Sequence, residues 1–410
     1  MGCGSSRVTR VAPAIPGANK WKVYEPDQYS ARFIDLDDNS TDLDDSGFHF
    51  VESCCYNKKF DPHHVYVPVQ RADLSCHIYK VDFKNGTKAE WVSQVVKNDG
   101  ETELSPFGTA LSDDGVLWLC CFNENMLLAL DLKGMVVLAE VTCPAPNDVC
   151  LSRDGKYVYA GCGSWLGKIP IAAGKGTIWR AETSPPYAIT KVAKNCQGTM
   201  AGVAEENGQV YCAHLQRMTV YGKPGPSAAK AVMQGARQIW TGYCSHSDAS
   251  EKVGKYYLAD NLSWWDDETR DVLFTPCYRC LGGAIGALLD RYAKLSAIGW
   301  GGARVLTMFN RLREQGLDAV ARVNDDGLSP EVDLSFSKGD VFEHAHLSLM
   351  NVRTRATANY VFKLDAAVQG HAYDGHITHV EHVGDGLIVC VNFQMQKLLI
   401  IDGKGLVQPP

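Results

Sequence analysis

The feature that most constrains the fold of this chain is a repeated unit of short strands joined by tight turns. The first of three copies is "FGTALSDDGVLWLCCFNENMLLALDLKG", which runs as strand, turn, strand, polar loop and strand. The turns of the copies are Asp114-Gly115, Asp154-Gly155 and Asn207-Gly208, where glycine supplies the positive φ of a tight hairpin. The copies start roughly forty to fifty residues apart, which is the span of a four-stranded propeller blade.

The same pattern extends towards both ends of the chain. Strands in "HHVYVPVQ" and "CHIYKVDFKNG" predict an earlier blade, and "HITHVEHVGDGLIVCVNFQMQKLLIIDGKG" predicts a last one. Residues 47–410 therefore predict an all-β, six-bladed β-propeller, with seven blades as the alternative. Because a propeller is a closed ring, we expect the first and last strands to share a blade.

One segment, at about 281–325, departs from the strand pattern. Its apolar residues recur at intervals of three and four, which is the period of a helix. We predict a short helical insertion of two helices between blades, separated by Gly301 and Gly302.

Residues 1–46 predict a flexible N-terminal tether that ends in the acidic linker "DLDDNSTDLDDSG". The start "MGCGSS" fits the pattern for N-myristoylation of Gly2, and Cys3 stands where a palmitoyl group would be attached. Two acyl chains hold a protein stably on a bilayer. The tail therefore predicts a lipid-anchored protein on the cytoplasmic face of a membrane; a chance Gly-Cys start would leave it cytosolic.

Composition excludes several other classes of protein. The chain of 410 residues has a net charge of −7 and no basic block, which argues against binding of nucleic acid. It has fifteen cysteines but no apolar secretory leader, so we expect reduced thiols, buried or inert. No second pair of ligands follows Cys277 and Cys280 at the spacing of a zinc site.

The blade sequences carry a family resemblance. "PNDVCLSRDGKYVYAG" resembles a blade of the senescence-marker-protein, gluconolactonase and strictosidine-synthase-like propellers, and the last blade is similar to their closing blade. The resemblance implies a six-bladed propeller with a central pocket, often with a divalent cation, and hydrolysis of lactones or esters. Thr378 or a neighbour stands where true strictosidine synthases have their catalytic glutamate, which argues against that activity.

The resemblance also suggests site residues. Asn147 matches the metal-binding asparagine of the family, and Asp260 and Asn261 in "LADN" offer further oxygen ligands, suited to calcium. A loop that closes a hairpin is the alternative for that pair. The candidate catalytic residues are His376 and Asp148.

Three histidines in "YDGHITHVEH" could suggest a metal site. The β-branched residues between them and the turn after them instead predict the innermost strand of the closing blade. With a period of two, His379 and Glu381 share one face and His382 lies on the other, so the histidines do not converge on one ion. We expect His376, at the entrance of the strand, to face the central pocket and the others to pack between blades.

Two classes of function stay open. The first is a membrane-tethered, metal-dependent hydrolase of lactones or esters, which acts on a small molecule in the pocket. The second is a non-catalytic propeller that serves as a membrane-associated scaffold for protein partners.

Overall fold

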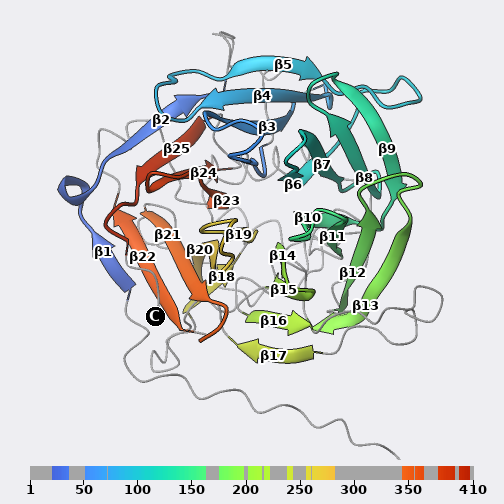
Figure 1. Cartoon of the computed structure of the whole chain (residues 1–410). Coiled ribbons are helices and arrows are strands. Elements are labelled where there is room, and N and C mark those ends of the chain that lie inside the picture. Colours follow the sequence, from blue (N-terminus) through green and yellow to red (C-terminus); the bar gives the residue numbers. More distant parts are fainter. Residues whose placement is uncertain are drawn as a thin grey trace, which may run out of the picture.

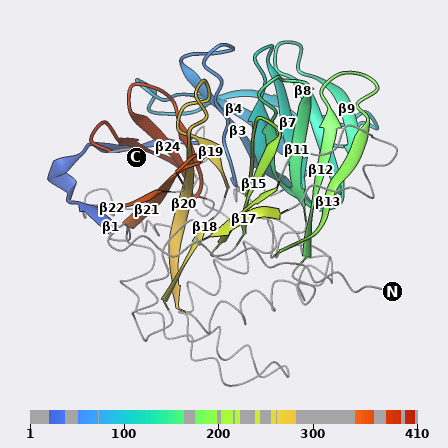
Figure 2. The same cartoon turned by 60° about the horizontal axis from the view of Figure 1, so that its bottom comes forward.

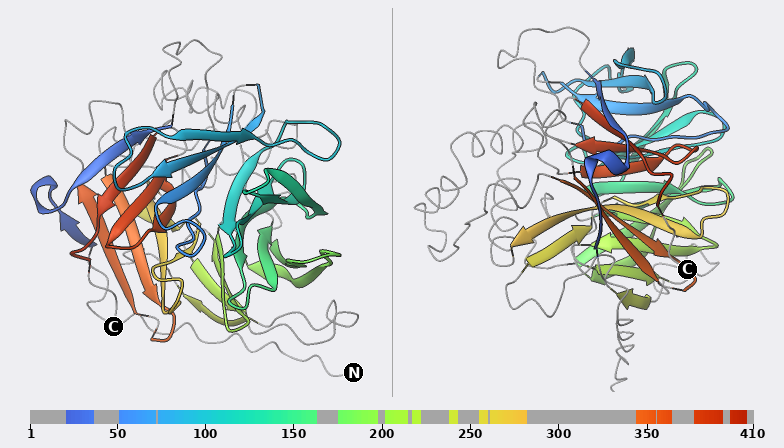
Figure 3. Two further views of the ribbon diagram at one scale, coloured as in Figure 1. Left: turned by 45° about the horizontal axis from the view of Figure 1, so that its top comes forward. Right: turned by 90° about the vertical axis from the view of Figure 1, so that its left-hand side faces the viewer.

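Six β-sheets stand around a common axis in the structure, a computed structural model of the chain (Figure 1). It describes residues 21–36, 51–71, 73–162, 175–197, 202–214, 217–221, 238–242, 255–259, 261–281, 344–354, 356–363, 377–392 and 397–406. Views from other sides show each sheet beside the next around the ring (Figures 2 and 3). The prediction of an all-β propeller is confirmed; the number of blades stays a prediction, which the six sheets support.

Four sheets run in sequence order from the axis outwards, and each is named here by its first strand. The β3 sheet contains β3 (His64–Gln70), β4 (Cys76–Asp82) and β5 (Glu90–Gln94). The β6 sheet contains β6 (Pro106–Leu111), β7 (Val116–Cys121), β8 (Met126–Asp131) and β9 (Val136–Thr142). The β10 sheet contains β10 (Pro146–Leu151), β11 (Tyr157–Cys162), β12 (Lys175–Glu182) and β13 (Ile189–Gln197). The β14 sheet contains β14 (Gly202–Glu206), β15 (Gln209–His214), β16 (Arg217–Tyr221) and β17 (Gln238–Gly242).

The other two sheets combine strands from distant parts of the sequence, and each is named by its strand nearest the axis, β19 or β23. The β19 sheet contains β18 (Lys255–Ala259), β19 (Ser263–Trp264), β20 (Val272–Leu281), β21 (His344–Asn351), β22 (Thr357–Lys363) and β1 (Trp21–Tyr24). The β23 sheet contains β23 (Ile377–His382), β24 (Leu387–Asn392), β25 (Lys397–Asp402) and β2 (Ala31–Asp35). A short 3-10 helix, η1 (Pro26–Gln28), joins β1 to β2.

Neighbouring sheets are held together by six apolar clusters, each shared between two sheets. For example, Trp118 of the β6 sheet packs in one cluster with Val158 of the β10 sheet, and Phe274 of the β19 sheet packs in another with Ile388 of the β23 sheet. The remaining clusters join the other neighbouring pairs. Because every sheet takes part in two clusters, the apolar contacts close the ring.

The strands nearest the axis are buried along both faces. In β10, β14 and β23 at least the first four residues are buried, without the alternation of a sheet that faces water on one side. Residues 51–55 take the corresponding place in the β3 sheet, where Cys55 exchanges both backbone hydrogen bonds with Tyr66 at 2.9 Å. An inner strand lies between two neighbouring sheets, which explains its burial.

The predicted hairpin turns are confirmed. Asn207 and Gly208 have φ angles of 52° and 76°, the two positive values of a type I′ turn between β14 and β15. Gly115 and Gly155 also have positive φ in the turns that follow β6 and β10. These turns connect antiparallel neighbours, as the sequence indicates.

The expected tether over residues 1–46 needs correction, because part of it belongs to the ring. β1 pairs in parallel with β22, and β2 pairs in antiparallel with β25 as the outermost strand of the β23 sheet. The last strand, β25, thus shares a sheet with β2, the second strand of the described chain, whereas the first strand, β1, lies in the neighbouring β19 sheet. An N-terminal strand and the C-terminal strand therefore share a sheet, but the expectation that the first strand would do so is wrong. The predicted start of the propeller at residue 47 is wrong, since two short edge strands need few apolar side chains and resemble a linker in sequence.

Several predictions fall on residues outside the described part. They are the helical insertion at about 281–325 beyond the end of β20, and the acylation sites Gly2 and Cys3. In the described part of the chain, no helix is long and apolar enough to span a membrane. Of the ten free cysteines in the described part of the chain, nine are buried, which agrees with the expectation of buried thiols. Their reduced state stays a prediction.

Candidate functional site on the propeller axis

Asp148 ties three inner strands together at the end of the axis where these strands begin, called the start end here. Its side chain is 1% exposed. Its Oδ2 accepts a hydrogen bond of 2.7 Å from the amide of Val203 on β14, and the amide of Leu262, next to β19, also donates to its carboxyl. The inner edge of each sheet carries backbone groups without a partner in that sheet, and a carboxylate can accept from several of them.

Burial raises the pKa of Asp148 from 3.8 to about 7. Loss of solvation outweighs the opposite effects of the nearby His379 and of the amide hydrogen bonds. A carboxyl with a pKa near 7 can take up or release a proton at neutral pH, as a general acid or base must.

Gly108 on β6 allows Asp148 to lie this close to the neighbouring sheet. A Cβ atom at position 108 would overlap the Cα and Oδ1 of Asp148 and approach the carbonyl oxygen of Asn147 at 2.9 Å. The carboxyl can therefore occupy its position on the axis because residue 108 of the β6 sheet is a glycine, which has no side chain.

Two asparagines lie beside this carboxyl. Asn147 precedes Asp148 on β10 and is 5% exposed. Asn261 precedes Leu262 and is 1% exposed, and neither its Oδ1 nor its Nδ2 has a hydrogen-bond partner in the described structure. Buried polar atoms normally have a partner, which can be a bound water, ion or ligand.

The donor chemistry of these residues fits a hard cation. Amide and carboxylate oxygens are the ligands that calcium prefers, and the Oδ1 of Asn261 is free to act as one. Among the residues that the structure describes, no group of three or more His, Cys, Asp and Glu is arranged to hold a metal ion. Of the described residues at the start end, Asn147 and Asn261 are therefore the ones whose amide oxygens could hold a cation.

Two histidines of the closing strand β23, His379 and His382, lie on opposite faces of the strand, as the sequence predicts. His379, 2% exposed, places its Nε2 3.4 Å from Oε1 of Glu381, so these two side chains share a face. His382 stacks on Trp265 of the β19 sheet, with ring centroids 4.2 Å apart, and burial lowers its pKa. His376 and Asp260, the other two candidate site residues on this side of the axis, lie outside the described residues.

Arg270 ties the same three inner strands at the opposite end of the axis, called the turn end here. Its side chain is 7% exposed, and the guanidinium donates through Nη1 to the carbonyl oxygens of Leu151 and Glu205 at 3.2 and 3.1 Å. It also forms an ion pair of 2.8 Å with Asp267. Burial raises the pKa of Glu205, whose Oε2 lies 3.8 Å from the guanidinium.

Sequence reasoning missed Arg270 and the inner segment around Glu52. Arg270 stands in "WDDETRD", which looks like a solvated turn, and no pattern in it indicates a buried guanidinium. The structure has Glu52 in the inner segment, where its carbonyl oxygen accepts a hydrogen bond of 2.8 Å from Thr378 of β23.

The fold and these residues define a β-propeller protein with a buried acid on its axis. No model of a known protein family matches the sequence, and no curated protein matches it. Among solved structures, the chain is similar to "Kuenenia stuttgartiensis Hydrazine Synthase", with a TM-score of 0.47 and 10% identity over 90% of this chain and 80% of that chain.

A second similar structure is titled "Crystal structure of Nidogen/Laminin Complex". Its TM-score is 0.37 and its identity 9%, over 56% of this chain and 75% of that chain. At these values neither likeness carries an inference about function. The resemblance to the gluconolactonase group rests on the blade motifs alone and stays a hypothesis.

Proposed function

We propose that this chain is a hydrolase of lactones or esters with its active site at the start end of the axis. The observation that carries the proposal is Asp148, a buried carboxyl whose pKa of about 7 suits proton transfer near neutral pH. Asn261 beside it has an unused side-chain amide that can donate to a developing negative charge.

In the proposed reaction a water molecule attacks the carbonyl carbon of the substrate. Asp148 takes a proton from this water, and the carbonyl oxygen becomes negatively charged. The Nδ2–H of Asn261 donates to that oxygen. The bond between the carbonyl carbon and the leaving oxygen then breaks, and the proton held by Asp148 passes to the leaving oxygen, directly or through His376.

A divalent cation, calcium by the chemistry of its ligands, is part of the proposal. The oxygens of Asn147, Asn261 and Asp260 would hold it at the start end. When bound, it would polarise the carbonyl group of the substrate.

Anchoring to the cytoplasmic face of a membrane is a separate part of the proposal. It rests on the sequence around Gly2 and Cys3. We expect Gly2→Ala to move the protein from the membrane fraction to the soluble fraction of cells, and a Gly2→Ala protein that stays on membranes would refute acylation of Gly2 as the cause.

The hydrolase proposal is tested with the purified full chain and a panel of five- and six-membered lactones and aryl esters, with calcium and with a chelator. We expect Asp148→Asn to lower kcat/KM by about 10²- to 10⁴-fold, as for loss of a general base. Glu268→Gln, an exposed change at the turn end, serves as the matched control and keeps full activity. A folded wild-type protein without hydrolysis, or an active Asp148→Asn variant, contradicts the proposal.

A non-catalytic scaffold is the second candidate function, and exposed apolar residues favour it. Trp91 on β5 and Val136 on β9 are 53% and 55% exposed on the outer strands of neighbouring sheets. Aromatic side chains are enriched where proteins bind one another, so the exposed Trp91 is a candidate contact for a partner. A folded protein that hydrolyses nothing in the panel, yet binds a membrane protein through Trp91, would favour the scaffold.

A further inference from the structure

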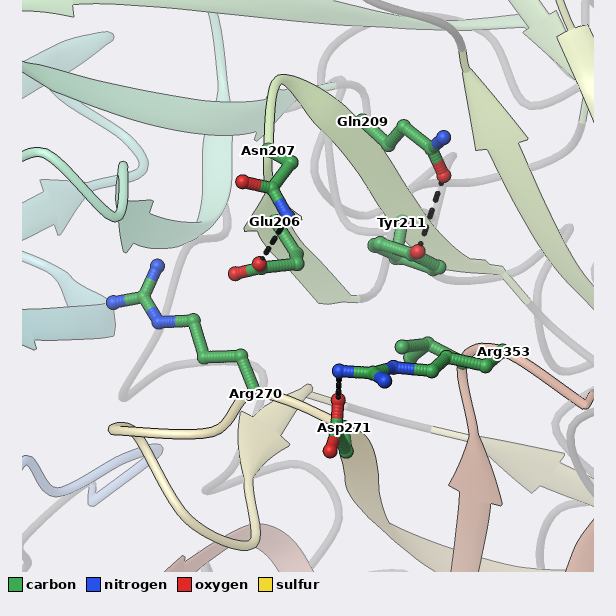
Figure 4. A pocket seen from close by; sticks show the side chains of 8 residues that line it. Glu206, Asn207, Gln209, Tyr211, Arg270, Asp271 and Arg353 are labelled. Carbon is green, nitrogen blue, oxygen red and sulfur yellow. Dashed lines mark hydrogen bonds and ion pairs between the residues drawn. The ribbon is translucent and has the colours of Figure 1, made fainter.

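A pocket of about 280 Å³ lies between the β14 and β19 sheets at the turn end of the molecule (Figure 4). Its walls come from the hairpin between β14 and β15, the turn before β20, and the turn between β21 and β22. The volume is just below the usual range for sites of drug-sized ligands, so the pocket suits a smaller molecule. It lies at the other end of the axis from Asp148.

Glu206 supplies a buried carboxylate to this pocket. The residue is 8% exposed, and its Oε1 accepts hydrogen bonds of 2.5 Å from Arg153 and from Asn207. Its Oε2 is buried and has no partner among the residues that the structure describes. A buried carboxylate oxygen without a donor is unfavourable, so a ligand that brings an N–H group to it would be stabilised.

The charge around the pocket favours a cationic ligand. Six carboxylates, at positions 205, 206, 266, 267, 268 and 271, belong to the strand end and the turn that form two of its walls. Three guanidinium groups oppose them, Arg153, Arg270 and Arg353. Arg270 is engaged by Asp267 and by backbone carbonyls, and Arg353 pairs with Asp271 at 2.6 Å. The excess of negative charge therefore attracts cations to this face.

The remaining walls offer an apolar surface. Tyr211 is 3% exposed, stacks edge-on against Trp264, and donates its hydroxyl to Oε1 of Gln209 at 3.2 Å. Val352, 6% exposed, lines the opposite side from the β19 sheet. These side chains offer apolar contacts to a short alkyl chain of a ligand, and a cation near the aromatic ring is favourable.

We propose that this pocket binds a small organic cation, a primary amine or a guanidine, whose N–H groups donate to the free Oε2 of Glu206. The ligand bridges the β14 and β19 sheets. The site goes beyond the proposed hydrolysis and does not depend on it.

The ligand class is tested with butylguanidine and butylurea, which have nearly the same shape but differ in charge. We expect calorimetry on the full wild-type chain to show that butylguanidine binds at least tenfold tighter than butylurea. Because the ligand binds only the folded state, butylguanidine also raises the Tm. Equal binding of the two compounds, or no binding of butylguanidine, overturns the proposal.

The position of the site is tested with a matched pair of variants. Glu206→Gln keeps the shape of the side chain and its hydrogen bond to Arg153 but removes the charge, so we expect at least a tenfold loss of butylguanidine binding. Asp27→Asn removes an exposed carboxylate from η1, which does not line the pocket, and leaves the affinity nearly unchanged. Unchanged binding by Glu206→Gln overturns the site. The comparison of the two ligands on wild type needs no variant, so a Glu206→Gln protein that fails to fold still leaves the proposal open to refutation.

Discussion

Asp148 and Arg270 hold the same three inner strands from opposite ends of the axis, yet their electrostatic situations differ. Asp148 accepts hydrogen bonds from the backbone of two neighbouring strands and has no cation within ion-pair distance among the described residues, and its pKa is raised to about 7. Arg270 donates to two backbone carbonyls and pairs with Asp267. Arg270 is a buried charge with a counter-charge, and its contacts stabilise the fold. Asp148 is a buried acid without a counter-charge, so its protonation state can change near neutral pH.

The largest effect is expected at Arg270. Arg270→Met leaves Glu205 buried without its cation and two carbonyl oxygens without their donor, so we expect a loss of about 3–5 kcal/mol in the free energy of unfolding. Urea denaturation measures it. The control is Arg353→Met, which breaks an exposed pair and should cost less than about 1 kcal/mol. Equal losses in the two variants would remove the distinction between the two ends.

The next effect concerns pH. Because the pKa of Asp148 in the folded state, about 7, lies above its ordinary value of 3.8, folding favours the protonated form. The associated stability is complete below about pH 4 and is lost as pH rises through 7, by no more than roughly 4 kcal/mol. We expect Asp148→Asn to flatten the decline in unfolding free energy between pH 4 and 8.

Two other carboxyl groups contribute to the decline of the unfolding free energy with rising pH. Burial also raises the pKa of Glu205 and of Glu381, so some dependence on pH remains in Asp148→Asn. A pH profile of unfolding identical in wild type and Asp148→Asn would show that Asp148 is ionised like an ordinary surface carboxyl.

A smaller loss is expected from filling the space beside Asp148. Gly108→Ala places a methyl group against its Cα and Oδ1, and we expect a loss of about 1–3 kcal/mol from overpacking. If Asp148 is the general base, kcat falls as well. Gly405→Ala is the control, since its Cβ would meet only Tyr24, at an ordinary 3.9 Å. Equal stability of the two variants would mean that Gly108 does not fix the carboxyl.

The smallest effect has the opposite sign. Asn261→Leu replaces a buried amide that has no partner in the described structure, so we expect unchanged stability or a gain of up to about 1 kcal/mol, together with loss of hydrolysis. The control is Asn359→Leu, which removes the acceptor of a 2.6 Å hydrogen bond from Ser348 and should destabilise the protein. Thermal unfolding of both variants measures the difference.

Much of the fold could be predicted because it follows from local patterns. The turn residues Asn207-Gly208 and the β-branched residues of β23 determine hairpins and strands without reference to distant parts of the chain. The period of a strand places His379 and Glu381 on one face, and their contact at 3.4 Å confirms it. Asn147 at the beginning of an inner strand is likewise a local feature.

The rest depends on contacts between residues far apart in sequence. β1 and β2 form strands because they pair with the edge strands β22 and β25. Each has five residues or fewer, which is too short for a clear alternation of apolar and polar residues. The burial of Arg270 and the raised pKa of Asp148 arise from sheets that meet at the axis. A single sequence contains no signal for either.

The pairing of β2 with β25 also bears on how the ring is completed during synthesis. Residues 31–35 leave the ribosome before residues 397–402 exist, and at about 5–20 residues per second the delay is roughly twenty to seventy seconds. Throughout this time Ile34, fully buried in the finished ring, has no partner strand. Closure of the ring is therefore a late step of synthesis, and the apolar side chain of Ile34 is buried by this sheet only after the last strand has been made.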